Sequence, residues 1–367
     1  MKFTTFQSSF AKALNQVSRI VSSRTTLPVL GNILITAEKG KIQLSATDLE
    51  IAITTQTTGK VEEDGKLTIP ARLLTEFIIN NNDESIEFST KGTSLNLKSK
   101  HYEANINGIS AEEFPTIPLL SKDLFCSIKK EVFIDATKKV SIAPANDETR
   151  PVLAGIYFVF NGKILTLAAT DSYRLSEKKI HLEEDLSDKK FIVPSRTMAE
   201  VLRISSGDES EAISISSTEN QILFKVGETQ IISRLIEGAF PPYSQIIPSS
   251  SKIKATVQYS ELLSAVKMSA LFAKNSANNV RIKTEGQTLL ISSMANEAGD
   301  TVSKIAAEVS GGEIEIAFNV RYVLDVLQVV QSDKVIFELN DDASAGIIKS
   351  GKDKDFVYIV MPLKIDA

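Results

Sequence analysis

The chain has 367 residues, 43% of them hydrophobic, and a formal net charge of −5. This charge excludes a protein that coats nucleic acid with its whole surface, but it allows a local basic face. The single cysteine, Cys126, excludes an internal disulfide framework, and no apolar run has the length of a membrane span or a signal peptide. We therefore expect a soluble, cytoplasmic protein.

The first third of the chain predicts two helices among antiparallel strands. Apolar residues at helical spacing predict a helix from residue 8 to 21. Alternating runs then predict strands at 29–36 and 41–55, on either side of a turn at Gly40. A second helix follows Pro70, and further alternating strands are expected downstream of it.

The second third predicts the same order of elements. A helix from 130 to 142 carries Lys138 and Lys139, which we expect to point outward. Two strands then flank a turn at Gly162, and a second helix follows Pro194. Three more alternating runs predict strands at 211–217, 221–227 and 230–235.

The last third repeats this order once more. It opens with a helix at 259–272, has a turn at Gly286, and carries a second helix within 318–327. An apolar strand ends the chain near Pro362. Because proline cannot donate a ladder hydrogen bond, we expect it to stop this strand and to leave the last residues free.

The three thirds are therefore copies of one unit. In the second helix of each, an arginine is followed four residues later by an acid, as Arg72 and Glu76, Arg196 and Glu200, and Arg321 and Asp325. The three arginines are 124 and then 125 residues apart, a period that is too long for a solenoid and fits a whole domain. We predict an α+β fold of three domains, at 1–121, 122–247 and 248–367, each with two helices on antiparallel sheet.

The sequence shows no catalytic motif. No phosphate-binding glycine loop, nucleophile elbow or zinc-binding helix is present, and His101 and His181 stand alone. Asp48 and Asp171 occupy equivalent places after a strand, where an aspartate usually forms a turn. We expect no catalytic residue, no metal and no cofactor, and we keep an enzyme that uses carboxylates alone as an alternative.

Several segments resemble the bacterial sliding clamp, the beta subunit of DNA polymerase III, over the whole length and in order. They are Thr26–Asn32, Ala46–Glu50, Ile69–Arg72, Ala169–Leu175, Gly238–Tyr243, Phe318–Leu327 and Val360–Leu363. The resemblance implies a head-to-tail homodimer that forms a ring of six domains around duplex DNA. Such a ring slides, tethers the replicative polymerase, catalyses no reaction, and is opened by a separate clamp loader.

A ring that slides must hold phosphates without reading bases, so it needs positive charge on the surface that faces DNA. Basic residues of the repeated helices supply this charge. Two further arginines lie in loops ahead of a proline: Arg24 before Pro28, and Arg150 before Pro151. The DNA-binding candidates are Lys12, Arg19, Arg24, Arg72, Lys138, Lys139, Arg150, Arg196, Arg203, Lys267 and Arg321.

The resemblance also implies a pocket between the second and third domains for peptides of clamp-binding proteins, such as the polymerase and the loader. Its residues would be Leu153, Thr170, Ser172, Arg174, Leu175, Pro241, Ile246, Asn319, Tyr322, Ile359, Val360, Met361, Pro362 and Leu363. At the dimer interface we expect Tyr102 on one edge and Leu271 with Phe272 on the other.

A second interpretation is a monomeric three-domain protein that binds another polymer, such as a polysaccharide. A polysaccharide site favours exposed aromatic side chains. This chain has no tryptophan and only 7% aromatic residues, so the composition favours the clamp.

Overall fold

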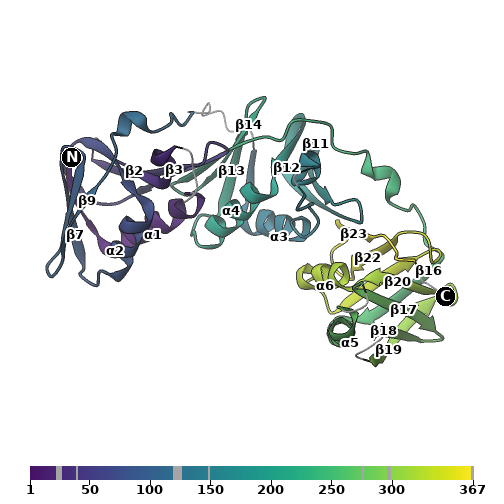
Figure 1. Ribbon diagram of the computed structural model, residues 1–367. Coiled ribbons are helices and arrows are strands. Elements are labelled where there is room, and N and C mark those ends of the chain that lie inside the picture. The colour runs from purple at the N-terminus through teal and green to yellow at the C-terminus, as the bar shows by residue number, and fades with distance from the viewer. Residues whose placement is uncertain are drawn as a thin grey trace. The chain divides into compact units, whose positions relative to one another are not determined.

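A computed structural model describes residues 1–21, 27–38, 40–118, 126–147, 149–274, 277–295 and 299–364 (Figure 1). The chain forms two compact units, one made of Met1–Lys130 with Glu200–Leu235 and the other of Glu131–Ala199 with Ile236–Ala367. Each unit is described by itself. Within the described ranges, no helix combines the length and the apolar character needed to cross a lipid bilayer.

The first unit contains two antiparallel sheets. Five strands lie in the order β5-β1-β7-β8-β9, and eight lie in the order β10-β13-β14-β15-β4-β3-β2-β6. Their bounds are β1 Lys2–Phe6, β2 Asn32–Glu38, β3 Lys41–Thr47, β4 Ile51–Thr57, β5 Lys60–Glu63, β6 Gly65–Pro70, β7 Ser85–Lys91, β8 Ser94–Lys98, β9 Glu103–Asn107, β10 Cys126–Lys129, β13 Ala212–Ser217, β14 Gln221–Val226 and β15 Thr229–Arg234.

The second unit contains ten strands in the order β11-β12-β23-β22-β21-β16-β19-β18-β17-β20. Their bounds are β11 Gly155–Thr170, β12 Arg174–Pro194, β16 Ile253–Gln258, β17 Asn279–Glu285, β18 Thr288–Ala295, β19 Gly299–Ser310, β20 Glu315–Asn319, β21 Lys334–Leu339, β22 Gly346–Ser350 and β23 Phe356–Val360. The ladders between neighbouring strands are antiparallel, as the alternating sequence pattern predicts.

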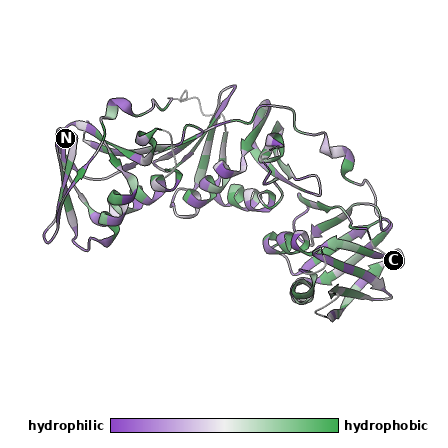
Figure 2. Ribbon diagram, in the orientation of Figure 1, coloured by the Kyte–Doolittle hydropathy of each residue, from purple (hydrophilic) through white to green (hydrophobic). Residues whose placement is uncertain are grey.

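The helices that the periodicity predicts are present. In the described residues they are α1 Gln7–Val17, α2 Ala71–Asn80, α3 Lys130–Val140, α4 Ser195–Ser206, α5 Tyr259–Ala273 and α6 Val320–Val329. The repeated segment thus places α2, α4 and α6 directly after a strand in each third. Each helix is amphipathic: α1 buries Phe10, Leu14 and Val17 and exposes Lys12. Figure 2 shows hydrophobic and hydrophilic residues on the same helices.

The three turn glycines adopt the backbone conformation that favours glycine, with φ of 77° at Gly40, 58° at Gly162 and 57° at Gly286. Gly40 and Gly286 separate paired strands, β2 from β3 and β17 from β18. In the second third, β11 spans both strands that we expected around Gly162. Its register with β12 shifts on each side of this glycine.

Strand pairing joins each third to the next, and this explains why the compact units do not coincide with the repeats. The last strand of the second third, β15, pairs with β4 of the first third, with Ile231 opposite Ile53. In the same way β23 pairs with β12, with Ile359 opposite Leu175. We call these two places the first and the second junction.

Candidate partner-binding and DNA-facing surfaces

A rigid turn precedes β12 at the second junction. The Asp171 carboxylate accepts hydrogen bonds from the backbone N–H of Tyr173 at 2.9 Å and of Arg174 at 3.0 Å. The Thr170 hydroxyl donates to the carbonyl of Arg174 at 2.6 Å and accepts from the N–H of Ser172 at 3.1 Å. Ser172 has a φ of 79°. These bonds fix the turn, as expected of an aspartate after a strand.

Arg174 connects this turn to α6. Its Nε donates to Asp171 at 3.0 Å, and a second nitrogen donates to Asp325. The guanidinium carbon lies 4.3 Å from the centre of the Tyr322 ring, in a cation–π arrangement. Burial alone would lower the pKa of Arg174, but Tyr358, Asp325 and Asp171 together raise it. The side chain therefore stays charged and holds the turn against the helix.

Of the predicted peptide-pocket residues, Arg174 contacts Tyr322, and Met361 binds the carbonyl of Tyr173 in this turn. The whole predicted set differs in depth. Four of its residues lie in the interior and can only form the base of a pocket: Leu153, Leu175, Ile359 and Val360. Six are partly buried: Thr170, Arg174, Asn319, Tyr322, Pro362 and Leu363. Four are exposed: Ser172, Pro241, Ile246 and Met361.

The prediction that the tail is free after Pro362 is wrong for the described residues. Strand β23 ends at Val360, but the N–H of Met361 donates to the carbonyl of Tyr173 at 2.8 Å. The N–H of Leu363 donates to the carbonyl of Ala317 at 2.8 Å. Pro362 cannot donate, yet its neighbours can, so the proline interrupts the ladder without releasing the chain. Residues 365–367, which include Asp366, lie outside the described residues.

Each of the six described α-helices carries one exposed basic residue from the predicted DNA-binding set. In helix order these are Lys12, Arg72, Lys138, Arg196, Lys267 and Arg321. Arg19 is exposed just after α1. Arg150 is bound to the hydroxyl of Ser172 at 3.0 Å, and Arg203 to the carbonyl of Gln16 at 2.8 Å. Arg24 lies outside the described residues.

The prediction that Lys139 points outward is wrong. This side chain is only 5% exposed, and its ammonium lies 2.7 Å from Asp135 and 2.6 Å from Asp353. Lys178 binds the other oxygen of Asp353 at 2.6 Å. One signal in the sequence pointed this way: Lys139 stands beside Ala136 and Val140 on the apolar stripe of α3. Its carboxylate partner, 214 positions away, has no such signal.

Asp353→Ala should destabilise the protein strongly, by about 3–5 kcal/mol, because it leaves Lys139 and Lys178 without their shared carboxylate in a buried place. Burial alone would raise the pKa of Asp353, but hydrogen bonds from both lysines hold it below the usual range of an aspartate. A depressed pKa gives stability that is present above pH ~4 and lost as the pH falls through the folded-state value. Urea unfolding of both proteins at pH 7 and pH 3 measures this. A difference that stays the same at the two pH values would contradict the ion-pair explanation.

The two junctions are sealed by equivalent residues of different chemistry. At the first, the side-chain amide oxygen of Gln16 (Oε1) accepts hydrogen bonds from the hydroxyls of Thr55 at 2.7 Å and Thr229 at 2.9 Å. Lys139 has the same place in α3 that Gln16 has in α1, the tenth residue of the helix. The Lys139 ammonium lies 5.7 Å from the centre of the Phe356 ring. Phe356 is the first residue of β23, and Thr229 is the first residue of β15, so the two contacts are equivalent.

The predicted interface residues Tyr102 and Leu271 are exposed, and Phe272 is partly buried. Tyr102 directly precedes β9, the last strand of its sheet. Other exposed apolar residues on helices include Ile79 of α2 and Met268 of α5, which the sequence analysis did not single out. Met268 is the tenth residue of α5 and so corresponds to Gln16 and Lys139. The repeat could have identified it once the helix starts were known.

The folds and sequences of known proteins match this architecture. Models of the DNA polymerase III beta subunit match its N-terminal domain at residues 1–118, its central domain at 127–242 and its C-terminal domain at 244–364. Beta sliding clamps of Staphylococcus epidermidis and Staphylococcus aureus are 30% and 31% identical over 375 residues, covering 99% of each chain. Solved sliding clamps of Bacillus subtilis and Pseudomonas aeruginosa superpose with TM-scores of 0.95 and 0.94 at 26% and 27% identity, covering 100% of each chain.

These matches define a protein of three clamp domains, in which antiparallel sheets carry pairs of helices. The chain belongs to the DNA polymerase III beta-subunit family and is a bacterial sliding clamp of DNA replication. A monomeric polymer-binding protein is not favoured.

Proposed function

We propose that two copies of this chain close head to tail into a ring that encircles duplex DNA in the cytoplasm and tethers the replicative polymerase without catalysing a reaction. The domain limits proposed for this ring are 1–121, 122–247 and 248–367. One observation carries the proposal. Two of the three places where neighbouring thirds would meet are the junctions β4–β15 and β12–β23. The strands left for a third junction are β9 and β19.

The pairing pattern supports this third junction. In both junctions, the last strand of one third joins a strand that follows the glycine hairpin of the third before it. Strand β9 ends the first third, and β19 follows the hairpin of the last third. Residues 300–306 of β19 pair with β18 on one side, and the described residues offer no ladder on the other. A second copy can therefore pair its β9 with this edge, and closure then removes both edges.

The side chains at this third junction are apolar. By equivalence with Gln16 against Thr229 and Lys139 against Phe356, Met268 would meet Tyr102 of the partner copy. Ile79 is the ninth residue of α2, as Arg203 is of α4, and Arg203 reaches the end of α1. We therefore place Ile79 beside α5 of the partner copy. A sulfur–aromatic contact and aliphatic packing would hold the ring, where the inner junctions use hydrogen bonds and an ion pair.

The DNA-facing surface rests on the exposed cation that each helix carries. Charges spread over the six described helices of one chain, and over both copies in a ring, attract phosphates from every direction without base contacts. Lys139 is not part of this surface. Arg203 and Arg150 stay predictions, because their bonds within the chain compete with phosphate contacts.

Duplex DNA should bind weakly, without sequence preference, and less tightly as salt rises. Arg72→Ala, Arg196→Ala or Lys138→Gln should each weaken binding evenly and lower the salt slope by about one unit. Fluorescence anisotropy with two unrelated duplexes across a salt series measures both quantities. Lys60→Gln is the control, because Lys60 is an exposed lysine on a strand, β5, and not on a helix: its replacement should leave the salt slope unchanged. A strong preference for one duplex would contradict a sliding ring.

The turn at Arg174 and the exposed residues around it are proposed as the docking place for peptides of the polymerase, the clamp loader and other clamp-binding proteins. Buried Leu175 and Ile359 form a firm apolar base together with Tyr243, and Met361 and Ile246 add exposed apolar surface. A flexible methionine suits partners of varied sequence.

A further inference from the structure

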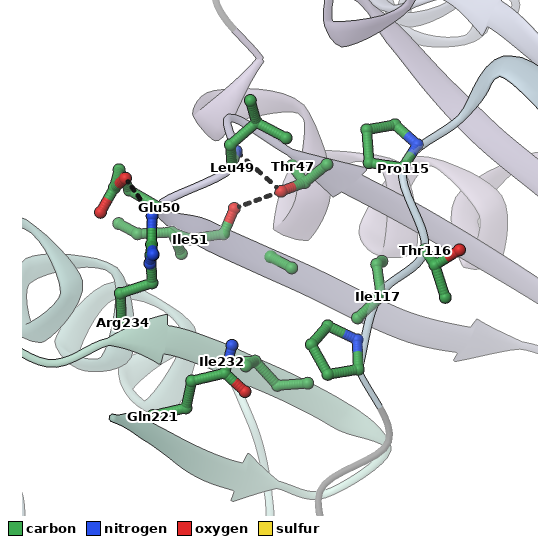
Figure 3. Close-up of a pocket in the computed structure, with 12 residues that line it drawn as sticks. Thr47, Leu49, Glu50, Ile51, Pro115, Thr116, Ile117, Gln221, Ile232 and Arg234 are labelled. Atoms are coloured by element: carbon green, nitrogen blue, oxygen red, sulfur yellow. Dashed lines mark hydrogen bonds and ion pairs between the residues drawn. The ribbon is translucent and has the colours of Figure 1, made fainter. Parts of the chain in front are cut away.

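A second pocket lies at the first junction, between β4, β15 and the segment 115–118 (Figure 3). Ile51, Ala52 and Ile232 form its apolar base and are buried. Pro115 and Ile117 line one side, and Glu50 and Arg234 lie on the opposite side. The cavity measures about 220 Å³. This is below the roughly 300–1,000 Å³ of pockets that enclose a small-molecule ligand, so it fits one or two side chains.

The pocket is built on the same backbone turn as the Arg174 site. Thr47 donates to the carbonyl of Ile51 at 2.9 Å and accepts from the N–H of Leu49 at 3.0 Å, as Thr170 does in its own turn. Asp48 accepts from two successive N–H groups, as Asp171 does. The N–H of Arg234 donates to the carbonyl of Glu50 at 3.0 Å, which matches Met361 and Tyr173. The two places are therefore repeat-related.

Leu49 is held in a strained and exposed state at the rim of this pocket. Its φ is 77°, a conformation that costs a non-glycine residue about 1–2 kcal/mol, and its side chain is 49% exposed. The equivalent residue of the second third is the polar Ser172, with nearly the same φ of 79°. Folding alone does not explain a leucine here, because asparagine, aspartate or glycine would fit this backbone better. Strain of this kind clusters at ligand-binding surfaces, so it suggests a function for this one.

We propose that this pocket is a second docking place for a short extended peptide of a clamp-binding protein, which inserts one leucine-sized side chain over Ile232 and under Leu49. The inference rests on the proposed function of the Arg174 site, since it assigns the same class of ligand to a repeat-related place. With a single anchor, affinity should be weak, with a Kd on the order of a millimolar.

The rim adds a preference for a neutral amide beside the anchor. Glu50 and Arg234 lie 3.4 Å apart, and their side chains are 65% and 61% exposed. A glutamine side chain can donate to the carboxylate and accept from the guanidinium at the same time. A glutamate in its place would be repelled by Glu50. The partner peptide should therefore combine glutamine with aliphatic residues.

The two docking places have their own isoleucine reporters. We would label the isoleucine methyl groups of the full-length protein and titrate it with the blocked pentapeptide Gln-Leu-Ala-Leu-Phe. Methyl NMR shifts at Ile117 and Ile232 report the first junction, and shifts at Ile246 and Ile359 report the second. We expect both sets to move, with the first-junction set saturating at higher peptide concentration. The peptide with glutamate in place of glutamine should lose a few-fold in affinity at the first junction, because repulsion by Glu50 is screened at this exposed rim and partly offset by Arg234.

Leu49→Asp removes the apolar side chain that would cover the inserted residue of the peptide. It should not destabilise the fold, because aspartate tolerates this φ better than leucine. It should raise the first-junction Kd at least tenfold, leave the second-junction Kd unchanged and keep the melting temperature. Arg234→Gln should weaken the same site through the rim, and Leu73→Asp, an equally exposed leucine on α2, is the matched control.

The outcomes separate the two proposals. Methyl shifts confined to Ile246 and Ile359 would overturn the docking place proposed at the first junction. They would leave the Arg174 docking place at the second junction standing. Methyl shifts confined to Ile117 and Ile232 would support the docking place at the first junction and would overturn the proposed location of the Arg174 site. Shifts at Ile117 and Ile232 that persist in both Leu49→Asp and Arg234→Gln would overturn the docking place at the first junction. If neither pair of methyl signals shifts, both proposals are contradicted.

Discussion

Replacing Met268 and Leu271 together by glutamate should convert the ring into monomers of 40.1 kDa. Both side chains are more than half exposed on α5 in the single chain, so the substitutions should not disturb its core. In the proposed ring they meet Tyr102 and Ile79 of the partner copy. Burial of a leucine or methionine side chain stabilises an interface by about 1.5–3 kcal/mol, and a buried unpaired carboxylate adds a further cost.

The effect is amplified by the geometry of closure. A head-to-tail dimer contains two copies of the same interface, so each substitution acts twice on one equilibrium. We expect the dimer dissociation constant to rise by roughly a thousandfold or more. Light scattering at micromolar concentration should give twice the chain mass for the unaltered protein and the chain mass for the variant.

Val132→Glu is the control for this experiment. It places the same charge at another exposed apolar residue, on α3, which the proposed ring leaves away from the third junction. The variant should remain a dimer with an unchanged melting temperature. If the double variant on α5 also keeps the dimer mass, the third junction lies elsewhere or the chain does not close through β9 and β19.

Local signals made much of this architecture predictable. Apolar residues one turn apart predict a helix from a short stretch of sequence. The three copies of the Arg-containing helix begin within two residues of the predicted places, as α2, α4 and α6. The period of the arginines then gave the three domains, because it depends only on residue order. These features need no knowledge of which segments meet in space.

The errors lie where distant segments meet. Lys139 was placed on the surface because its neighbour Lys138 is there, and the buried carboxylate that binds it comes from the last third. The tail was expected to be free because Pro362 cannot donate, yet Leu363 reaches Ala317. The first-junction pocket combines segments near 50, 116 and 232, and no local pattern connects them. Only strand register shows such meetings.

Replacing Met361 and Ile246 together by serine should strongly weaken binding of a clamp-partner peptide at the second junction. Both side chains are exposed, so the cost to folding is small. The unaltered protein should bind the peptide at this site with a Kd on the order of micromolar, because a few apolar groups are buried against the cost of ordering a flexible segment. Loss of two of those groups should raise the Kd by roughly a hundredfold. Calorimetric titration measures it, and Val132→Ser is the control.

Deleting residues 361–367 tests the same site more severely. It should abolish binding, and it should leave the dimer intact, because the tail takes no part in the third junction. The deletion also removes the backbone hydrogen bonds that Met361 and Leu363 donate. Each such bond contributes about 0.5–1.5 kcal/mol to the free energy of unfolding, so we expect a modest fall in melting temperature. Deleting only Asp366 and Ala367 should leave affinity equal or slightly better, since it removes a negative charge that would disfavour acidic peptides. The double serine variant separates lost contacts from lost order: if it binds normally while the long deletion does not, the tail acts by holding the Arg174 turn in place. Unchanged binding in all three variants would show that the peptide docks somewhere else.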